Sequence, residues 1–197
     1  MPEKSSKDRI LDASEKLFNT YGFHAVGIDK IQDISGVSKV TMYKHFGSKK
    51  DLILAVLTRR DERFQRSLSR RASEQSSLEG KIGALIDWHL EWFKSPDFNG
   101  CMFASADKEF GKTDYGIKAI TKSHKSRIYD LVKSIFDGEG VENSALQASI
   151  LFLLLEGAIT EAAVTGCIEH FENSRQCVLN FLSRGLTTDC DRQGMMP

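Results

Sequence analysis

The stretch IDKIQDISGVSKVTMYKHFGSKKDL, residues 28–52, decides the fold of this chain. Its isoleucines recur at helical spacing and predict a short helix over residues 28–35 with three side chains inward: Ile28, Ile31 and Ile34. Gly36 breaks this helix, because glycine adopts the left-handed conformation that a tight inter-helix turn requires. Ser38 can act as the N-cap of a second short helix that runs to about Phe46.

The second short helix is expected to have two different faces. Val37, Met42 and Phe46 can pack inward, and the outward side chains can all donate hydrogen bonds to phosphate or base edges: Lys39, Thr41, Tyr43, Lys44 and His45. Two short helices joined by a three-residue turn have the spacing of a helix-turn-helix, whose second helix enters the major groove of DNA. The alternative is that Tyr43 and His45 merely brace a three-helix core.

Helical patterns flank this motif on both sides. A serine cap at Ser5 or Ser6 opens a predicted helix that keeps Tyr21 on its apolar face and ends at Gly22. Ser48-Lys49-Lys50-Asp51 has the form of a capping box and opens a long helix over about residues 49–72. Arginines are expected to cover much of the remaining surface of that long helix: Arg59, Arg60, Arg63, Arg66, Arg70 and Arg71.

The rest of the chain is also predicted to be helical. No stretch alternates with the period of two that marks a β-strand, so the expected fold class is all-α with about nine helices. After a polar connector at 73–80, the further helices are expected at about residues 81–94, 101–110, 115–136, 143–165 and 168–186, with a turn at 137–140. The predicted domains are a helix-turn-helix DNA-binding domain, residues 1–50, and a C-terminal ligand-binding and dimerisation domain, residues 51–197.

Charge is unevenly distributed along the chain. The formal net charge is zero, yet residues 1–71 hold 15 Lys and Arg against 9 Asp and Glu. Residues 72–197 hold 12 against 18. A basic N-terminal part joined to an acidic C-terminal part suggests that only the first meets a polyanion. The alternative is that both parts are simply solvated surfaces.

Several other classes of protein find little support. No apolar run follows the basic residues of the N-terminus, so a signal peptide is not expected. The longest apolar stretch, residues 150–155, is far too short to span a bilayer, so no membrane partner is expected. Without a secretory signal, the cysteines are expected to be reduced cytosolic thiols: Cys101, Cys167, Cys177 and Cys190. The expected location is therefore the cytoplasm.

The N-terminal motif closely resembles a known family. The residues that carry the resemblance are Gly22-Phe23-His24-Ala25, Ile31, Gly36-Val37-Ser38-Lys39, Thr41-Met42-Tyr43-Lys44-His45-Phe46, Ser48-Lys49 and Leu52. Together they are similar to the N-terminal domain of TetR (tetracycline-repressor-like) transcriptional regulators over roughly residues 7–60. The resemblance implies a two-fold dimer on a palindromic operator in double-stranded DNA, with no cofactor, no metal and no enzymatic activity.

The resemblance also assigns roles to single residues. Lys39 and Val40 lie where base-edge contacts are made, and Lys44 is a further contact to either base or phosphate. The implied phosphate-binding positions are Thr41, Tyr43, His45 and Lys49. Two positions depart from the family pattern. Gly27-Ile28 stands where the second helix usually begins with Ser or Thr, and Val40 stands where a small residue is usual. A branched apolar side chain at that position could contact a thymine methyl group.

The C-terminal part is expected, by the same resemblance, to hold a small-molecule pocket and the dimer interface. Large apolar groups with a few polar ones are typical of ligand pockets, and the candidates are Trp88, His89, Trp92, Phe93, Met102, Phe103, Phe110, His124, Phe152 and Glu156. The candidate interface residues on the last two helices are Gly157, Ala158, Ala162, Gly166, Phe171, Val178, Phe181 and Leu182. For both sets, the alternative is ordinary intramolecular core.

These patterns predict a repressor that a small molecule releases from its operator. Three alternatives stay open. An enzyme lacks support, since the chain has no GxGxxG, P-loop, HExxH or GxSxG sequence, and its five histidines show no metal-ligand spacing. A thiol-based redox sensor would use one of the cysteines, although buried cysteines that act as small apolar residues are the simpler interpretation of the first three. A helical adaptor would bind another protein and would not require the outward set on the second short helix.

Overall fold

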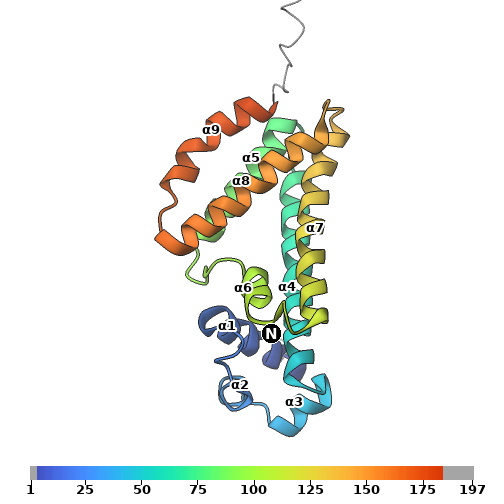
Figure 1. Ribbon diagram of the computed structural model, residues 1–197, viewed down its shortest axis with the longest axis vertical. Helices are drawn as coiled ribbons and strands as arrows, with labels where there is room; N and C mark the ends of the chain where they lie inside the picture. The colour runs from blue at the N-terminus through green and yellow to red at the C-terminus, as the bar shows by residue number, and fades with distance from the viewer. Residues whose placement is uncertain (1–3, 184–197) are drawn as a thin grey trace, which may run out of the picture. The chain divides into compact units, whose positions relative to one another are not determined.

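The computed structural model describes residues 4–183 of the chain. Within that range the protein is all-α, as predicted, and contains nine helices and no strand (Figure 1). The predicted tail at residues 187–197 and Cys190 lie outside the described residues. The helices are α1 (Ser6–Tyr21), α2 (Ile28–Ser35), α3 (Lys39–Phe46), α4 (Lys49–Ser73), α5 (Leu78–Phe93), α6 (Met102–Phe110), α7 (Tyr115–Gly138), α8 (Ser144–Thr165) and α9 (Glu169–Ser183).

The helices form two compact units that do not follow chain order. Unit 1 is the chain up to Ser67 together with Ser95–Arg127, and unit 2 is Leu68–Lys94 together with the described chain from Ile128 onward. Helices α4 and α7 each contribute residues to both units. This division differs from the sequence-based boundary at residue 50, because α6 and the first part of α7 belong to the same unit as the helix-turn-helix.

The N-terminal helices begin and end where local chemistry predicts. The hydroxyl groups of Ser5, Ser38 and Ser48 accept hydrogen bonds from backbone amides in the first turns of α1, α3 and α4. Ser48 also donates to the Asp51 carboxylate at 2.6 Å, which confirms the interaction between the two polar ends of the predicted capping box. Capped ends satisfy amides that a helix otherwise leaves without partners. The starts of these three helices are therefore defined by residues within their own first turns.

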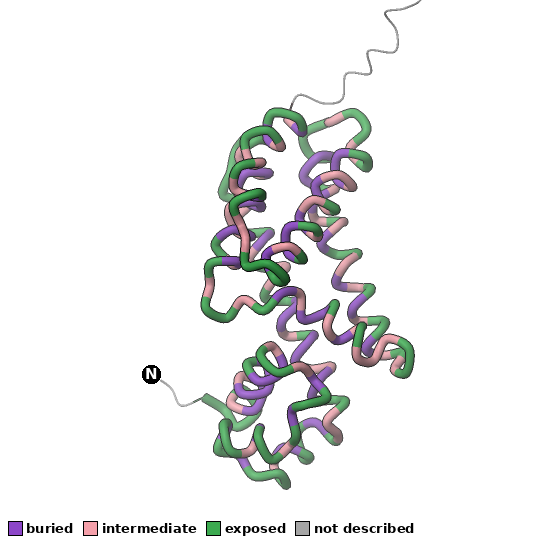
Figure 2. The backbone as a smooth tube through the Cα atoms, turned by 60° about the vertical axis from the view of Figure 1, so that its left-hand side comes forward, coloured by how far each residue is buried: buried purple, intermediate pink, exposed green. Residues whose placement is uncertain are grey.

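One apolar core holds unit 1 together. Figure 2 shows buried positions along one face of each N-terminal helix. The core takes residues from α1, the loop after it, α2, α3 and the first part of α4, and it also includes residues of α6 and α7: Ile10, Phe18, Phe23, Ile31, Met42, Leu52, Val56, Met102, Phe103 and Ile117 among others. Helix α6 is thus packed into the same core as the helix-turn-helix.

Two side chains predicted to point inward are exposed. Ile34 is 59% exposed, because Ser35, one helical turn after Ile31, occupies the inward position instead. Tyr21 is 55% exposed at the last residue of α1, and the ammonium group of Lys30 lies 3.5 Å from the centroid of its ring. The isoleucine period was too short, at just over two turns, to locate the centre of the buried face.

Two predicted helix boundaries are also wrong. Helix α5 begins at Leu78 rather than Lys81, because the Ser77 hydroxyl accepts a hydrogen bond from the Gly80 amide at 3.1 Å and caps the helix earlier. Helix α7 continues through Gly138, inside the predicted turn at 137–140, and Lys133 pairs with Asp137 at 2.6 Å one turn later. Polar residues next to glycine predict a turn here, but they extend the helix by two residues beyond Phe136.

A buried carboxylate joins α1 to α4. The Glu15 side chain is 9% exposed and contacts three guanidinium groups of α4: Arg59 at 2.9 Å, Arg60 at 3.0 Å, and Arg63. Arg59 also pairs with Asp12 at 2.8 Å. The expectation that these arginines cover the free surface of α4 is therefore wrong for Arg60, which is buried. Three of the arginines fix the position of the first helix on the long one.

Unit 2 is built around α5, which packs against both α8 and α9. Arg175 of α9 donates two hydrogen bonds of 2.7 Å to the Asp87 carboxylate of α5. The rings of Phe93 and Phe171 lie 5.8 Å apart at another point of the same contact. A bidentate arginine–carboxylate pair fixes orientation as well as distance, so the register of α9 on α5 is well defined.

We predict that Glu15→Gln destabilises unit 1 by roughly 3 kcal/mol, the lower end of the range for breaking a buried ion pair. Glutamine keeps the size of the side chain but removes the negative charge that the three guanidinium groups share, and only Arg59 keeps another carboxylate partner, Asp12. The measurement is the free energy of unfolding from a urea titration followed by circular dichroism. The matched control is Glu62→Gln at an exposed position of α4, for which we expect a change within about 0.5 kcal/mol. Equal stability of the two variants would contradict the role given to Glu15.

Candidate nucleic-acid interface

Two side chains accept hydrogen bonds from the first-turn amides of α3: one from the turn itself and one from α2. The Ser38 hydroxyl accepts from the Thr41 amide at 3.3 Å. The Gln32 side-chain oxygen, from α2, accepts from the Lys39 amide at 3.2 Å. Backbone amides that would otherwise lack partners are thereby satisfied by the protein itself. The direction in which α3 leaves the turn is therefore coupled to the position of α2.

The turn between α2 and α3 depends on Gly36. Its φ of 64° lies in the left-handed region, and its amide donates to the Gln32 carbonyl at 2.8 Å. A Cβ at this position would lie 2.6 Å from the Arg9 guanidinium, which donates to the Ser35 carbonyl at 2.7 Å. The left-handed backbone conformation therefore favours glycine, and a larger residue would also displace the end of the Arg9 side chain.

The two faces of α3 have the division that the sequence predicts. Val37, Met42 and Phe46 are buried. Five of the predicted DNA-contacting residues on this helix are exposed: Lys39, Val40, Tyr43, Lys44 and His45. Thr41 is half-buried, and its hydroxyl lies 3.0 Å from that of Ser38. The exposed face combines cationic, aromatic and hydroxyl groups, which are the groups that bind phosphates and base edges.

Val40 is the most unusual member of this face. It is 80% exposed although it is a branched apolar residue. Such a side chain gains nothing from water, and the apolar group that it can meet in a DNA major groove is the thymine methyl. Its exposure therefore favours a contact that contributes to sequence preference over one that contributes to general affinity.

Lys39 is held by an ion pair before any ligand arrives. Its ammonium group contacts the Asp29 carboxylate in the first turn of α2. A hydrogen bond to Asp29, together with that negative charge, raises the pKa of Lys39 above its usual value. Both side chains are largely exposed, so this pair is weak in water and DNA can displace it.

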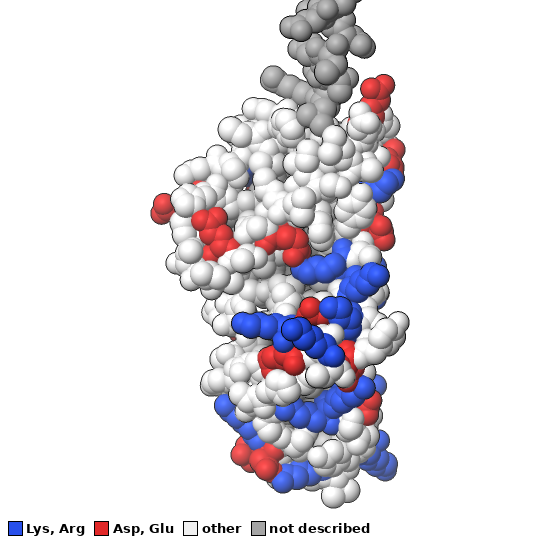
Figure 3. Space-filling view, in the orientation of Figure 1, with Lys and Arg blue, Asp and Glu red and all other residues white. Residues whose placement is uncertain are grey.

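The start of α4 carries the remaining predicted phosphate contact. Lys49 is half-buried, and burial lowers the pKa of its ammonium group. The neighbouring Lys50 pairs with Asp114, at the start of α7, at 2.7 Å. On the face shown in Figure 3, Lys and Arg gather over unit 1, while the surface of unit 2 is mostly uncharged. A local excess of positive charge is the electrostatic pattern of a surface that binds a polyanion.

Residues 10–56 match the model of the family described as bacterial regulatory proteins, tetR family. This range covers α2, α3, the turn at Gly36 and the start of α4. The N-terminal domain of the chain is therefore a TetR-family domain.

The TetR-family assignment agrees with individual relatives. The HTH-type transcriptional activator FasR of Mycolicibacterium smegmatis is 33% identical over 92 residues, which cover 45% of this chain and 42% of FasR. The HTH-type transcriptional repressor SCO4008 of Streptomyces coelicolor is 26% identical over 155 residues, 77% of this chain and 76% of that protein. The crystal structure of SCO4454, a TetR-family transcriptional regulator from Streptomyces coelicolor, superposes with a TM-score of 0.83 at 25% identity, covering 90% of this chain and 96% of that one.

The match to FasR spans less than half of that protein's length. By contrast, the likeness to SCO4454 extends over nearly the whole chain, so the two proteins share the same helical fold over both the N-terminal and the C-terminal parts.

The predicted pocket residues of the chain fall in both units. Trp88, His89, Trp92, Phe93, Phe152 and Glu156 lie in unit 2, whereas Met102, Phe103, Phe110 and His124 lie in unit 1. Met102 and Phe103 are part of the core shared with α1, and Phe110 packs on Phe23 and His24. The His124 ring stacks on Phe103 at 3.6 Å, and its Nδ1 lies 2.7 Å from the buried Asp61 carboxylate. A ligand-binding role for these residues stays a prediction.

The predicted interface residues are also of two kinds. Ala158, Ala162, Phe171 and Leu182 are buried within unit 2, where α8 and α9 pack on α5. Gly157, Gly166 and Phe181 are exposed, and Val178 is half-buried. Only the second group offers surface to another molecule.

Two acidic residues that position the interface could not be identified from the sequence. Glu15 fixes α1 on α4, and Glu109 of α6 accepts hydrogen bonds from the loop before α2. Each acts over more than 40 residues of sequence separation, and no short motif carries such a pairing. The excess of arginine on α4 was the one available signal, since buried arginines need carboxylate partners.

We predict different effects on DNA binding for two substitutions that lie one helical turn apart on α3. Lys44→Ala should weaken binding to all DNA sequences alike and reduce the log–log slope of affinity against salt by about 1, because a phosphate contact is lost. Val40→Ala should leave that slope unchanged and relax the preference at one base pair by about 1 kcal/mol. The measurement is fluorescence anisotropy on duplexes with single base-pair changes at several salt concentrations. A change in salt slope for Val40→Ala would contradict the assignment.

We also predict a specific acid sensitivity from the pair at the start of α7. The hydrogen bond from Lys50, together with one from the Ile117 amide, lowers the pKa of Asp114 below its ordinary value of 3.8. A carboxylate with a lowered folded-state pKa stabilises the protein above that value and loses this contribution as the pH falls below it. Asp114→Asn should therefore be less stable than the wild type at pH 7, and the difference should shrink as the pH falls below about 4 and disappear below the lowered folded-state pKa. Urea unfolding across this pH range is the test, and a constant difference would refute it.

Proposed function

We propose that this chain is a sequence-specific DNA-binding transcriptional regulator of the cytoplasm that acts as a homodimer on a palindromic operator. The observation that carries the proposal is the exposed face of α3, where Lys39, Val40 and Tyr43 project from a helix whose position is fixed by α1 and α2. FasR is described as an activator and SCO4008 as a repressor. We propose repression, with release by a small molecule and no enzymatic activity.

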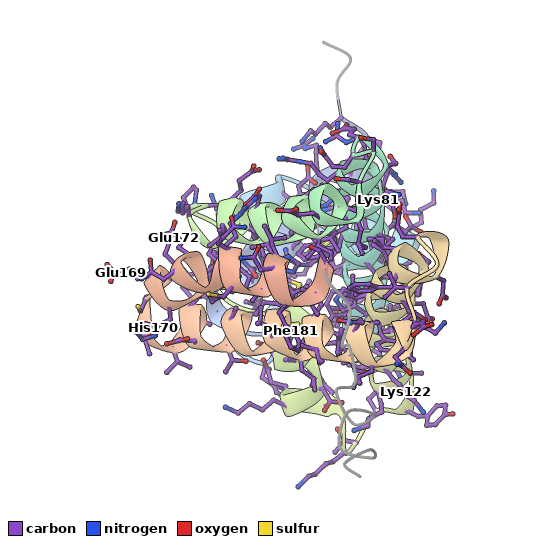
Figure 4. The ribbon with its side chains drawn as sticks, turned by 90° about the horizontal axis from the view of Figure 1, so that it is seen from above. Lys81, Lys122, Glu169, His170, Glu172 and Phe181 are labelled. Atoms are coloured by element: carbon purple, nitrogen blue, oxygen red, sulfur yellow. The ribbon has the colours of Figure 1, made fainter. Side chains whose placement is uncertain are left out.

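An exposed apolar face on α8 and α9 supports a homodimer. Leu153 and Val164 of α8 are 66% and 79% exposed, and Phe181 of α9 is 47% exposed. Figure 4 labels Phe181 on α9, away from the charged end of that helix at Glu169, His170 and Glu172. A second copy that covers this face would bury apolar surface on both protomers, as a two-fold interface requires.

The apolar composition of α8 also supports a homodimer. Among the described helices it is the one that is long and apolar enough to cross a membrane. The six-residue run at 150–155 understated this, because the apolar residues continue on both sides of it. We propose that a second protein copy covers this helix, because it packs on α5 within unit 2 and still leaves Leu153 and Val164 exposed.

We predict that Phe181→Glu prevents dimerisation, because it places a charge at the centre of the proposed interface. Sedimentation velocity should show a monomer, and operator binding should weaken with the loss of two-fold contacts. The control is Gln176→Glu, also exposed on α9 and about 140° around the helix from residue 181. A dimer of unchanged stability in Phe181→Glu would place the interface elsewhere.

The effector is proposed to bind to residues of unit 2. The rings of Trp88 and Trp92 lie 5.8 Å apart on α5 and are partly exposed, next to the buried His89. We propose that these residues, with Phe152 and Glu156 of α8, line the site. An effector that favours a conformation unsuited to DNA would weaken operator binding by about 5–150-fold, the usual size of such coupling.

The proposal is tested by selection from genomic DNA. The purified protein is incubated with fragmented DNA of its own genome at low salt, and the retained fragments are sequenced. Enrichment of a palindrome with half-sites about one helical turn apart supports the proposal. A folded protein that retains no sequence above background would refute it and favour the adaptor interpretation.

One observation favours a second candidate, regulation through a thiol. The Lys125 ammonium group lies 3.4 Å from the Cys101 sulfur, at the N-cap of α6. Cys101 and Cys167 are half-buried and Cys177 is exposed, so the expectation of three buried cysteines is wrong. If hydrogen peroxide oxidises Cys101 to a sulfenic acid and thereby weakens operator binding, Cys101→Ser should be insensitive to peroxide while Cys177→Ser responds like the wild type.

A further inference from the structure

A carboxylate outside the helix-turn-helix holds the loop that leads into it. The two oxygens of Glu109, on α6, accept from the backbone amides of Phe23 at 3.0 Å and His24 at 2.7 Å. The Nε2 atom of His24 lies 3.3 Å from the Glu109 carbonyl oxygen. Hydrogen bonds from amides to a carboxylate are stronger than those between neutral groups, so this loop is fixed by α6 and not by its own sequence.

The loop is shaped to allow this close approach. Gly22 has a φ of 79°, and a Cβ there would lie 2.9 Å from a Glu109 oxygen. The neighbouring Phe110 ring packs on the His24 ring at 4.3 Å and on the Phe23 ring at 6.1 Å. Glycine, carboxylate and aromatic ring therefore form one contact between α6 and the α1–α2 loop.

The same segment also reaches the far end of the helix-turn-helix. Asp114 directly precedes α7, and its carboxylate pairs with Lys50 in the first turn of α4 at 2.7 Å while it accepts from the Ile117 amide at 3.0 Å. Residues 28–46 are thus held before α2 by Glu109 and after α3 by Asp114. We call Glu109, Phe110 and Asp114 the α6–α7 anchor.

The N-terminus of α2 lacks a local device for the same task. Its N-cap is Gly27, and no side chain caps the helix. A Ser or Thr cap would fix the entry of the chain into α2 locally. Without one, the direction of α2 depends on the loop at residues 22–24, which Glu109 holds. Because the Gln32 side chain of α2 in turn holds the start of α3, a displacement of this loop moves the exposed face of α3.

We infer that Glu109 is a positioning residue for DNA binding, acting with Asp114 through the α6–α7 anchor. The inference rests on the proposed function, since it concerns how the α3 face is presented to an operator. Operator affinity would then depend on Glu109 of α6 as well as on the residues of α3 that face DNA.

The test compares Glu109→Gln, Asp114→Asn and the double variant with Glu142→Gln. Glu142 is exposed, far along the chain in unit 2, and its substitution removes the same charge. Removing a negative charge alone favours DNA binding, so a loss of affinity cannot come from electrostatics. Each protein is titrated with the selected operator and with a scrambled duplex, and amide hydrogen exchange is followed at Phe23 and His24.

We expect Glu109→Gln to lose at least about tenfold in operator affinity with unchanged binding to the scrambled duplex, together with faster exchange of the two amides. The double variant should lose less than the product of the single losses, because both substitutions release the same segment. Should Glu109→Gln fail to fold, Glu109→Asp keeps the charge but is one methylene too short to reach both amides. Released amides with operator affinity equal to that of Glu142→Gln would overturn the inference. A wild type without preference for the operator would instead refute the proposed function, and the inference with it.

Discussion

The contact of the Glu15 carboxylate with three arginines of α4 is the interaction on which the rest of the molecule depends. It attaches α1 to the long helix. Arg9 of α1 then holds the turn at Gly36, and the turn determines how α3 is presented. A buried carboxylate without its arginines would be costly, so this attachment specifies one arrangement of the first four helices. The exposed face of α3 has a defined direction because α1 is attached to α4 through Glu15, and because Arg9 and Gln32 hold the turn and the first residue of α3.

Local chemistry made the N-terminal fold predictable from the sequence. The serine caps, the glycine stops and the apolar period of α1 and α3 act within four residues of each other, and apart from the exposed Tyr21 they were found at the predicted positions. The failures were of two kinds. Ile34 was misplaced because two turns of helix define a face poorly, and the ends of α5 and α7 were misplaced because polar residues extend a helix as readily as they end it.

The candidate site was only partly predictable for a different reason. The outward residues of α3 follow from helical geometry, but the groups that position them do not. Glu109 lies 85 residues after His24 in the chain, and Glu15 lies 45 residues before Arg60. Pairings at such separations depend on tertiary packing, which no local pattern records. For the same reason the aromatic residues predicted to form one pocket divide between two units. The α6 residues among them pack against the N-terminal helices instead.

The most direct test of this account is a crystal structure of the protein bound to its selected operator. The account predicts two protomers related by a two-fold axis, with the α3 helices in successive major grooves about 34–36 Å apart. Lys39 and Val40 should face base edges, Tyr43 and Lys44 should face phosphates, and the Asp29–Lys39 pair should be broken. DNA bound through another surface, or α3 lying outside the groove, would contradict the central claim.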